Sequence, residues 1–247
     1  DASTNQTTKR LNNQIPNIPH CKILQNKHNQ GRAQIRNQLA QTAKYQWLLF
    51  IDADMNITQH NYIQNYIQTI KNILCCAKKP LNDQTTKRPL ATRLPQARNH
   101  LPPVIYGGYQ LLPPNHHSLR TLHSKETTKP LNHQPHRSLL RSYEHASREN
   151  PPNLRYIYEQ HTQKKHNLKW RKKHPYTALK ACNTIIHKNI FTQIQFDNKL
   201  KQYGYEDLQF AQQLQQHNIT VIHIHNTLTF QHYDTNQTFL QKTQQSI

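Results

Sequence analysis

Several features are scarce or missing in this 247-residue chain, and each scarcity excludes something. Only four glycines and 12 acidic residues occur. No run of 18 or more apolar residues is present, so we expect no transmembrane helix, and the start shows no signal-peptide pattern. The four cysteines fit neither a zinc spacing nor a secreted disulfide framework. These absences predict a cytoplasmic protein.

Positive charge, in contrast, is abundant. The 32 lysines and arginines give a formal net charge of +20 and a pI near 10.0. Such an excess is typical of proteins that bind nucleic acids or anionic membranes. The common residues, however, have codons that begin with A or C, whereas the scarce Gly, Val, Asp and Glu have codons that begin with G. A nucleotide bias of the source genome therefore explains the charge equally well.

The spacing of apolar residues predicts the first helices and strand of the chain. Apolar residues recur at helical spacing over residues 32–46 and again over 63–74. Between them, the continuous run WLLFI at 47–51 has the length of a parallel strand buried on both faces. A helix, a strand and a helix in this order favour an α/β fold.

Later segments show the same two patterns. VIYGGY at 104–109 predicts a short strand that ends at a glycine pair, whereas residues 111–174 are polar, basic and broken by prolines. Apolar residues at 208, 211 and 214 predict a helix that begins in the loop YGYED, and residues 219–224 are typical of a strand. A chain of this length favours one domain.

Two carboxylates, Asp52 and Asp54, directly follow the apolar run at 47–51. Open α/β sheets hold their ligands at the carboxyl ends of their strands. Carboxylate oxygens there suit a hard divalent cation such as Mn²⁺ or Mg²⁺, which often bridges to phosphate. A solvated turn after a strand fits the same pattern, so these two residues alone leave both interpretations open.

Three segments together resemble the inverting family-two glycosyltransferases. GRAQIRNQLAQTAKYQWLLFIDADM (31–55) resembles that family's helix, apolar strand and D-x-D. FDNKLKQYGYEDLQFAQQL (196–214) is similar to its acceptor-side motif, and NTLTFQHYDTNQTFLQKT (226–243) to its closing segment. The resemblance implies the GT-A fold of nucleotide-diphospho-sugar transferases, which is Rossmann-like, with a mixed, mostly parallel sheet flanked by helices.

The resemblance also implies a division of the chain. We expect one GT-A domain over 1–247, with a donor-nucleotide half at 1–110, a variable basic insert at 111–174 and an acceptor half at 175–247. DAST (1–4) resembles the element that follows the family's second strand. The domain is therefore expected to lack its first strand and helix.

The donor side of the site is implied by the same resemblance. Asp52 would contact the nucleotide ribose or the shell of the metal, and Asp54 would ligate Mn²⁺ or Mg²⁺ on the donor diphosphate. Asp1 and Arg36 match positions near the nucleotide base and ribose. Arg36 also fits a charge on a helix surface.

The acceptor side centres on YGYED. Asp207 matches the general base that takes the proton of the acceptor hydroxyl, a role typically worth ~10²–10⁴ in rate. Glu206 would orient the acceptor or the base, although a pair of acids at a helix N-terminus is also favoured by the helix dipole. His232 is the candidate third metal ligand, and His225 is the second choice.

Three further residues have both a functional and a structural interpretation. Gly107 and Gly108 either let the backbone approach the donor sugar or relieve the end of a strand. Asn183 matches a position near the sugar and the acceptor, and it also fits a buried turn residue.

The resemblance predicts an enzyme of glycan or polysaccharide biosynthesis. It would move a sugar from a nucleotide-diphosphate donor, with a UDP-sugar expected, to a glycan or lipid-linked acceptor. No nucleic-acid partner is expected, and the basic segment 111–174 is expected to touch the cytoplasmic face of a membrane. Two alternatives stay open, a basic nucleic-acid-binding module and a catalytically inactive, truncated paralogue.

Overall fold

The computed structural model describes residue 13 and residues 18–77, 101–112, 152–165, 167–200, 204–230 and 233–245. Asp1, with the DAST segment, and His232 lie outside this part of the chain. The elements are α2 (Arg32–Thr42), β1 (Trp47–Ile51), β2 (Met55–Asn56), α3 (Tyr62–Ala77), β3 (Val104–Tyr106), β4 (Tyr109–Leu111), α6 (Leu154–Lys165), α7 (Leu168–Lys173), β5 (Asn183–His187), α8 (Lys188–Gln193), α9 (Glu206–Gln216), β6 (Val221–His223), β7 (Leu228–Phe230) and α10 (Asn236–Gln245).

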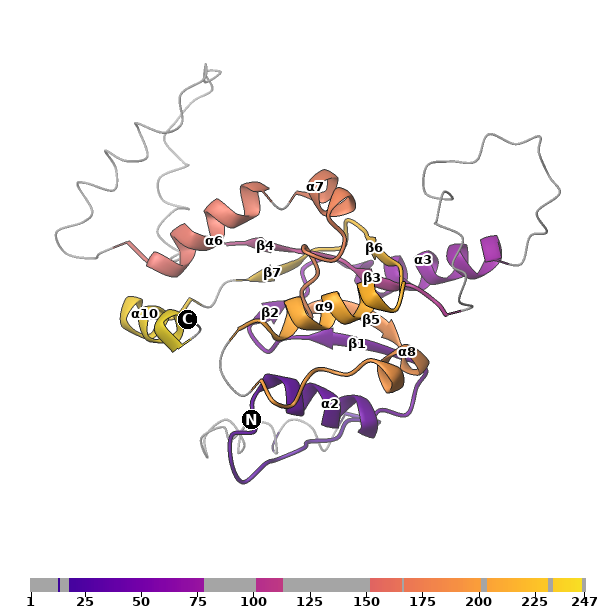
Figure 1. The fold of residues 1–247 in the computed structure, drawn as a ribbon, viewed down its shortest axis with the longest axis horizontal. Helices are drawn as coiled ribbons and strands as arrows, with labels where there is room; N and C mark the ends of the chain where they lie inside the picture. Colours follow the sequence, from indigo (N-terminus) through magenta and orange to yellow (C-terminus); the bar gives the residue numbers. More distant parts are fainter. Residues whose placement is uncertain are drawn as a thin grey trace, which may run out of the picture.

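The periodic segments form the elements that their patterns predict. The stripes at 32–46 and 63–74 become α2 and α3, and the run at 47–51 becomes β1 with the expected bounds. The helix expected from the YGYED loop is α9, and β6 lies within the strand-like residues 219–224. The architecture is therefore α/β, as expected (Figure 1).

The main sheet is mixed. Its strand order is β1-β5-β3-β6, with β5 antiparallel to both of its neighbours and β3 parallel to β6. Three of the four strands therefore point the same way. A second sheet has the order β2-β7-β4. Mixed sheets flanked by helices agree with the expected GT-A-like fold.

β1 is covered on both faces, as expected, but the parallel neighbour predicted for it is not found among the described residues. Its neighbour is the antiparallel strand β5, and in the described part of the chain β1 lies at the edge of the sheet. Leu48 is buried, whereas Ile51 is 38% exposed. A short apolar run indicates a strand, but the direction of its partner depends on β5, which lies more than 130 residues later in the sequence.

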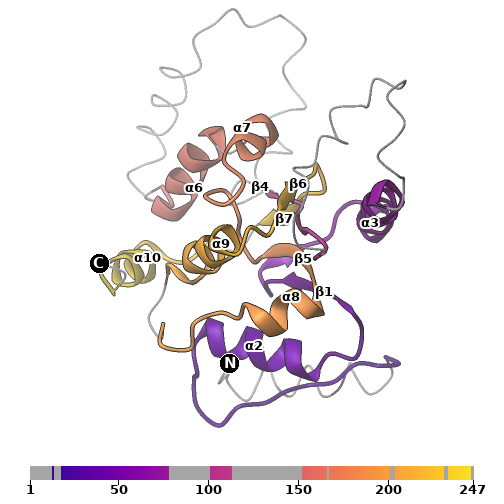
Figure 2. The same cartoon turned by 45° about the vertical axis from the view of Figure 1, so that its right-hand side comes forward.

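Two hydrophobic cores lie on the two faces of the main sheet. Because side chains alternate along a strand, Val104 and Tyr106 of β3 join one core and Ile105 joins the other. The first core packs α2, α8 and α9 on the sheet, and the second packs α3 (Figure 2). The strands thus form the middle layer of three.

The described end of the expected insert 111–174 packs on this framework. Helix α6 contacts β4 and α10, and α7 contacts β6. Asp234, just before α10, pairs with Arg155 of α6 and, at 2.9 Å, with Lys242 of α10. The two helices are thereby held together. Among the described helices, none combines the length and the apolar character that crossing a membrane requires.

Candidate functional site

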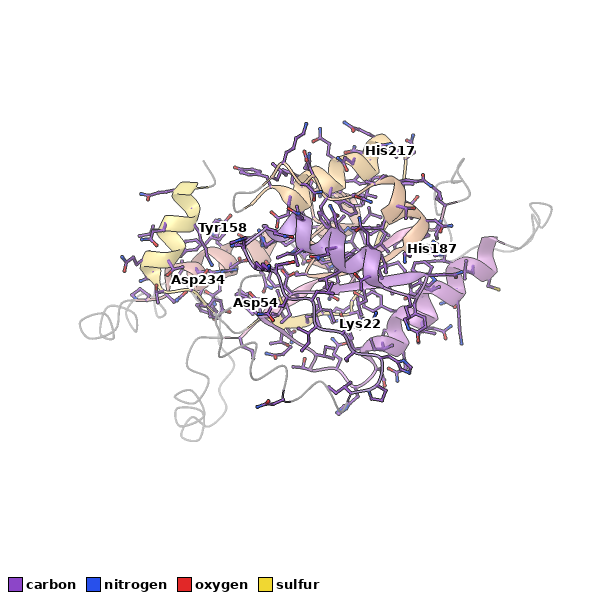
Figure 3. All side chains as sticks on the ribbon, turned by 90° about the horizontal axis from the view of Figure 1, so that it is seen from below. Lys22, Asp54, Tyr158, His187, His217 and Asp234 are labelled. Carbon is purple, nitrogen blue, oxygen red and sulfur yellow. The ribbon has the colours of Figure 1, made fainter. Side chains whose placement is uncertain are left out.

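The strand ends that carry predicted site residues lie at one edge of the main sheet in the described part of the chain. Asp52 follows β1 and Gly107 follows β3, so both stand at carboxyl ends of strands. Strand β5 runs the other way, and its first residue, Asn183, pairs with Ile51 and accepts a hydrogen bond from the Gly107 N–H at 3.1 Å. In Figure 3, Asp54 lies left of the centre and His187, the last residue of β5, lies toward the right. The sheet topology thus brings the site residues together.

Arg36 joins the donor-side and acceptor-side motifs. Its Nη2 donates to Asp52 Oδ1 at 2.9 Å. Its Nη1 donates to Glu206 Oε1 and to Asp207 Oδ1, each at 3.2 Å. Burial alone would lower the pKa of Arg36, which is 6% exposed, but the three carboxylates outweigh it and raise the pKa. This guanidinium therefore stays charged and links motifs that lie far apart in the sequence.

The cluster around Arg36 carries an excess of negative charge. Arg32 Nη2 lies 2.6 Å from Glu206 Oε1. Two guanidinium groups therefore face three carboxylates, those of Asp52, Glu206 and Asp207. We call these five residues the carboxylate junction. One negative charge remains when all five are ionised, which favours a nearby cation.

Asp207 is the more exposed member of the acid pair. Its side chain is 26% exposed. Burial raises the pKa of this carboxyl above its usual range, and the charge of Arg36 partly opposes that rise. Phe196 and Phe210 line a small apolar cavity next to it, with their ring centroids 4.4 Å apart. A carboxylate in this setting binds a proton more tightly than one in water.

Glu206 lies deeper than its neighbour. It is 3% exposed and contacts both arginines of the carboxylate junction. The sequence predicted that it orients the acceptor or the base. Its contacts support positioning of Arg36 and, through Arg36, of Asp207.

Tyr205 is a candidate that the sequence interpretation missed. It immediately precedes the acid pair, is 63% exposed and has a positive φ of 65°. Bulky residues seldom adopt that conformation, and it is enriched at functional sites. The aromatic residue inside YGYED was the signal that could have identified it.

Asp52 and Asp54 offer carboxylates beside the end of β1, and both oxygens of Asp52 accept hydrogen bonds from Arg36 Nη2. The chain turns between them, with the Met55 N–H bonded to the Asp52 carbonyl at 3.1 Å. No group of three or more His, Cys, Asp or Glu side chains in the described residues is arranged to hold a metal. Mg²⁺ commonly takes one or two carboxylates and completes its shell with substrate phosphates and water. The two carboxylates suit such sharing. His225, the second-choice ligand, lies exposed after β6.

Gly107 and Gly108 form a turn between β3 and β4 that admits no side chain. We call it the glycine turn. A Cβ at Gly107 would overlap the Asn226 carbonyl oxygen and lie 2.6 Å from Asn183 Nδ2. Gly108 has a φ of +85°, and a Cβ there would lie 2.6–2.7 Å from the guanidinium of Arg171. Both residues are buried.

Asn183 supports the glycine turn from inside the protein. It is fully buried. Its Oδ1 accepts from Tyr62 Oη at 2.5 Å and from Tyr66 Oη at 2.7 Å. Its Nδ2 donates to the carbonyls of Gly108 at 2.5 Å and Asn226 at 2.8 Å. The predicted contact with sugar is untested, and the observed contacts are those of a residue that positions the turn.

Two basic residues beside the turn were also missed. Arg171 of α7 is 5% exposed, although the surrounding sequence KWRKKH suggested only a run of surface charge. Lys180 Nζ donates to Tyr109 Oη at 2.9 Å, and that hydroxyl donates to Glu159 Oε2 at 2.7 Å. Burial alone would lower the pKa of Lys180, but Glu159 and other anions raise it, so the ammonium group stays charged.

Comparison with known proteins gives two family matches. Residues 1–143, more than half of the chain, match the family described as Glycosyl transferase family 2. Residues 163–236 match the family described as N-terminal domain of galactosyltransferase. No curated protein matches the chain. Asp52 and Asp54 lie in the first matched segment and Asp207 in the second, so Arg36 joins residues from both.

Proposed function

Because the chain belongs to Glycosyl transferase family 2 and is therefore a glycosyltransferase, we propose that it transfers a sugar from a UDP-sugar to a hydroxyl group with inversion. The carboxylate junction carries this proposal. A transferase needs a donor site and a base for the acceptor, and one guanidinium here holds Asp52 of the first motif and Asp207 of the second. Both groups therefore face one reaction space.

The donor is proposed to bind at the edge of the sheet that Asp52 and Asp54 occupy. These two residues would hold Mn²⁺ or Mg²⁺. When bound, the ion would neutralise charge on the departing diphosphate. Asp1, which lies outside the described residues, remains the proposed contact to the nucleotide base. The backbone of the glycine turn would approach the donor sugar.

Arg36 is assigned a different role from the one predicted. All its described hydrogen bonds go to carboxylates of the junction, and it is nearly inaccessible. We therefore assign it to positioning Asp52 and Asp207 rather than to binding the ribose. Groups held in place in this way need little reorganisation at the moment of reaction.

Asp207 is the proposed base. The acceptor oxygen forms a bond to the anomeric carbon on the face opposite the diphosphate, while the bond to the diphosphate oxygen breaks. The proton of the acceptor hydroxyl passes to the Asp207 carboxylate. Its raised pKa favours this proton transfer. Attack from the opposite face inverts the configuration at the anomeric carbon.

The acceptor is proposed to be a glycan or a lipid-linked glycan. Tyr205, exposed beside the base, offers an aromatic face for an acceptor sugar. Contact of the basic residues 111–174 with an anionic membrane would bring a lipid-linked acceptor close. Residues 163–236 match a family described by galactosyl transfer, so UDP-galactose is the first donor to test.

The decisive experiment measures UDP binding by calorimetry with and without Mn²⁺ or Mg²⁺. Wild-type protein should bind UDP in a metal-dependent way, and Asp54→Asn should lose at least about tenfold of the metal-dependent affinity. The control, Asp197→Asn, removes a carboxylate outside the junction and should bind like wild type. If Asp54→Asn keeps the full metal-dependent affinity, Asp54 is not a ligand.

A further inference from the structure

The guanidinium of Arg171 has no charge partner in the part of the chain that the structure describes. No carboxylate pairs with it, and Nη1 makes no hydrogen bond. Nη2 donates only to two backbone carbonyls, those of Gly107 at 3.4 Å and Ile224 at 3.2 Å. Burial lowers the pKa of Arg171, yet an arginine remains protonated in proteins. Among the described residues, Arg171 is thus a buried positive charge without a compensating carboxylate.

The neighbouring side chains leave that charge in place. The Tyr106 ring lies under the guanidinium, with Cζ 5.2 Å from the ring centroid. His223 packs edge-on against the same ring. Burial lowers the pKa of His223 to about 4, so its imidazole is neutral at pH 7, and its Nδ1 also has no hydrogen-bond partner. An aromatic face attracts a cation but does not neutralise it.

Folding gives no reason to keep such a charge. An ion without a partner is costly to bury, and exchanging a buried charge for a neutral side chain of similar size is often neutral or stabilising. The polar contacts of Arg171 are with two carbonyls, and a neutral amide side chain can donate to a carbonyl as well. The charge itself therefore needs an explanation outside the stability of the fold.

The position of Arg171 supplies such an explanation. The guanidinium lies directly against Gly108, on the inner side of the glycine turn. Gly107 pairs with Asn183, and Asn183 pairs with Ile51, the residue before Asp52. Two strand spacings put the backbone of the turn roughly 10 Å from Asp52, and the guanidinium, which also bonds to Ile224 after β6, lies on the far side of β3 from Asp52. A charge in the protein interior is poorly screened over that distance.

We propose that Arg171 is an electrostatic and positioning residue of the donor site. Its uncompensated charge attracts the phosphate groups of the nucleotide, and its bonds to Gly107 and Ile224 hold the glycine turn in place. This inference rests on the proposed function, because it needs a nucleoside diphosphate beside the turn. It adds a residue to which neither sequence motif points.

The test separates charge from shape with three variants. Arg171→Gln keeps a donor for the carbonyls and removes the charge, whereas Arg171→Lys keeps the charge. Lys173→Gln removes a charge from an exposed position on the same helix as a control. Each protein is titrated with UDP, and with uridine, which has no phosphate, in the presence of Mn²⁺, and its thermal unfolding is recorded.

We expect Arg171→Gln to bind UDP about tenfold more weakly, as one charge at roughly 10 Å and an intermediate dielectric constant predicts. Its uridine affinity and melting temperature should match those of the wild type. Arg171→Lys and Lys173→Gln should retain most of the UDP affinity.

Three results would overturn the inference. Arg171→Gln could bind UDP as tightly as wild type, it could lose uridine and UDP affinity equally, or it could fail to fold. The last two would make Arg171 a structural residue. A wild-type protein that binds neither ligand would instead refute the proposed donor, and this inference with it.

Discussion

Arg36 and Arg171 are buried to the same extent at the same edge of the sheet, at 6% and 5% exposure, but their surroundings are opposite. Arg36 touches three carboxylates, which raise its pKa. Arg171 touches backbone carbonyls and an aromatic ring, and burial lowers its pKa. One guanidinium is compensated by the protein and the other is left for a ligand to compensate.

The different surroundings of the two arginines suggest that Arg36 acts mainly on the stability of the fold and Arg171 mainly on ligand binding. A charge whose partners are built into the fold contributes to the fold, and its removal leaves those partners buried and unpaired. A buried charge without partners lowers the stability of the fold. Binding of an anion to that charge restores the lost stability. The carboxylate junction should therefore control folding and chemistry, whereas Arg171 should control affinity for phosphate.

The largest expected effect concerns the base of the junction. Asp207→Asn should reduce transfer by about 10²–10⁴-fold, because the amide cannot take the proton of the acceptor. UDP affinity should stay unchanged, since the base acts only in the chemical step. Release of UDP from UDP-galactose and direct UDP titration measure the two quantities. Near-wild-type turnover would move the role of base away from Asp207.

The next effect is on stability. Arg36→Met should lower the free energy of unfolding by about 3 kcal/mol, the lower end of the range for a broken buried pair, because Asp52 and Asp207 remain partly exposed. Arg171→Gln should change the same quantity by less than about 1 kcal/mol. Urea unfolding compares them. Equal losses of unfolding free energy in the two variants would contradict the different roles assigned to Arg36 and Arg171.

A smaller loss is expected from Gly108→Ala. The new Cβ must occupy a left-handed backbone position and meet the Arg171 guanidinium, at a cost of about 1–3 kcal/mol. Combining it with Arg171→Gln should cost less than the sum of the two changes, because one of the clashing groups is gone. A double-mutant cycle in urea measures the coupling. If the two losses of unfolding free energy were strictly additive, Gly108 and Arg171 would not be in energetic contact.

The smallest effect concerns pH. Asp207 must be ionised to act, and burial raises its pKa, so transfer should fall about tenfold for each pH unit below a midpoint that lies above the usual aspartate range. Arg171→Gln should shift that midpoint little, since the charges that act most strongly on Asp207 are those of Arg36, Glu206, Arg32 and Asp52. Rate–pH profiles of both proteins test this. A midpoint near that of free aspartate would contradict the assignment.

Local periodicity was enough to predict much of this molecule. The apolar stripes of α2 and α3 and the run of β1 depend on neighbours within a few turns or residues, so the sequence displays them directly. Asp52 and Asp54 stood out because acidic residues are rare here and these two follow a strand, whereas Asp207 was assigned from the resemblance of YGYED to a known family. Their common partner, Arg36, came from the same motif, but its burial did not.

What the sequence could not predict depends on long-range packing. The antiparallel pairing of β1 with β5 joins residues 47–51 to 183–187, and no local pattern encodes that direction. Arg171 belongs to one of many basic stretches in a chain with 32 lysines and arginines. Only the packing of α7 behind Gly108 distinguishes it from the surface charges around it.

The side-chain amide of Asn183 holds the glycine turn through the two hydrogen bonds that its NH₂ group donates. Spontaneous deamidation of an asparagine replaces its NH₂ group, which donates two hydrogen bonds, with a carboxylate oxygen that only accepts them. In this protein the NH₂ group faces the carbonyl oxygens of Gly108 and Asn226. A carboxylate in this place would therefore set a negative charge against two acceptors, so the shape of the turn depends on this single amide.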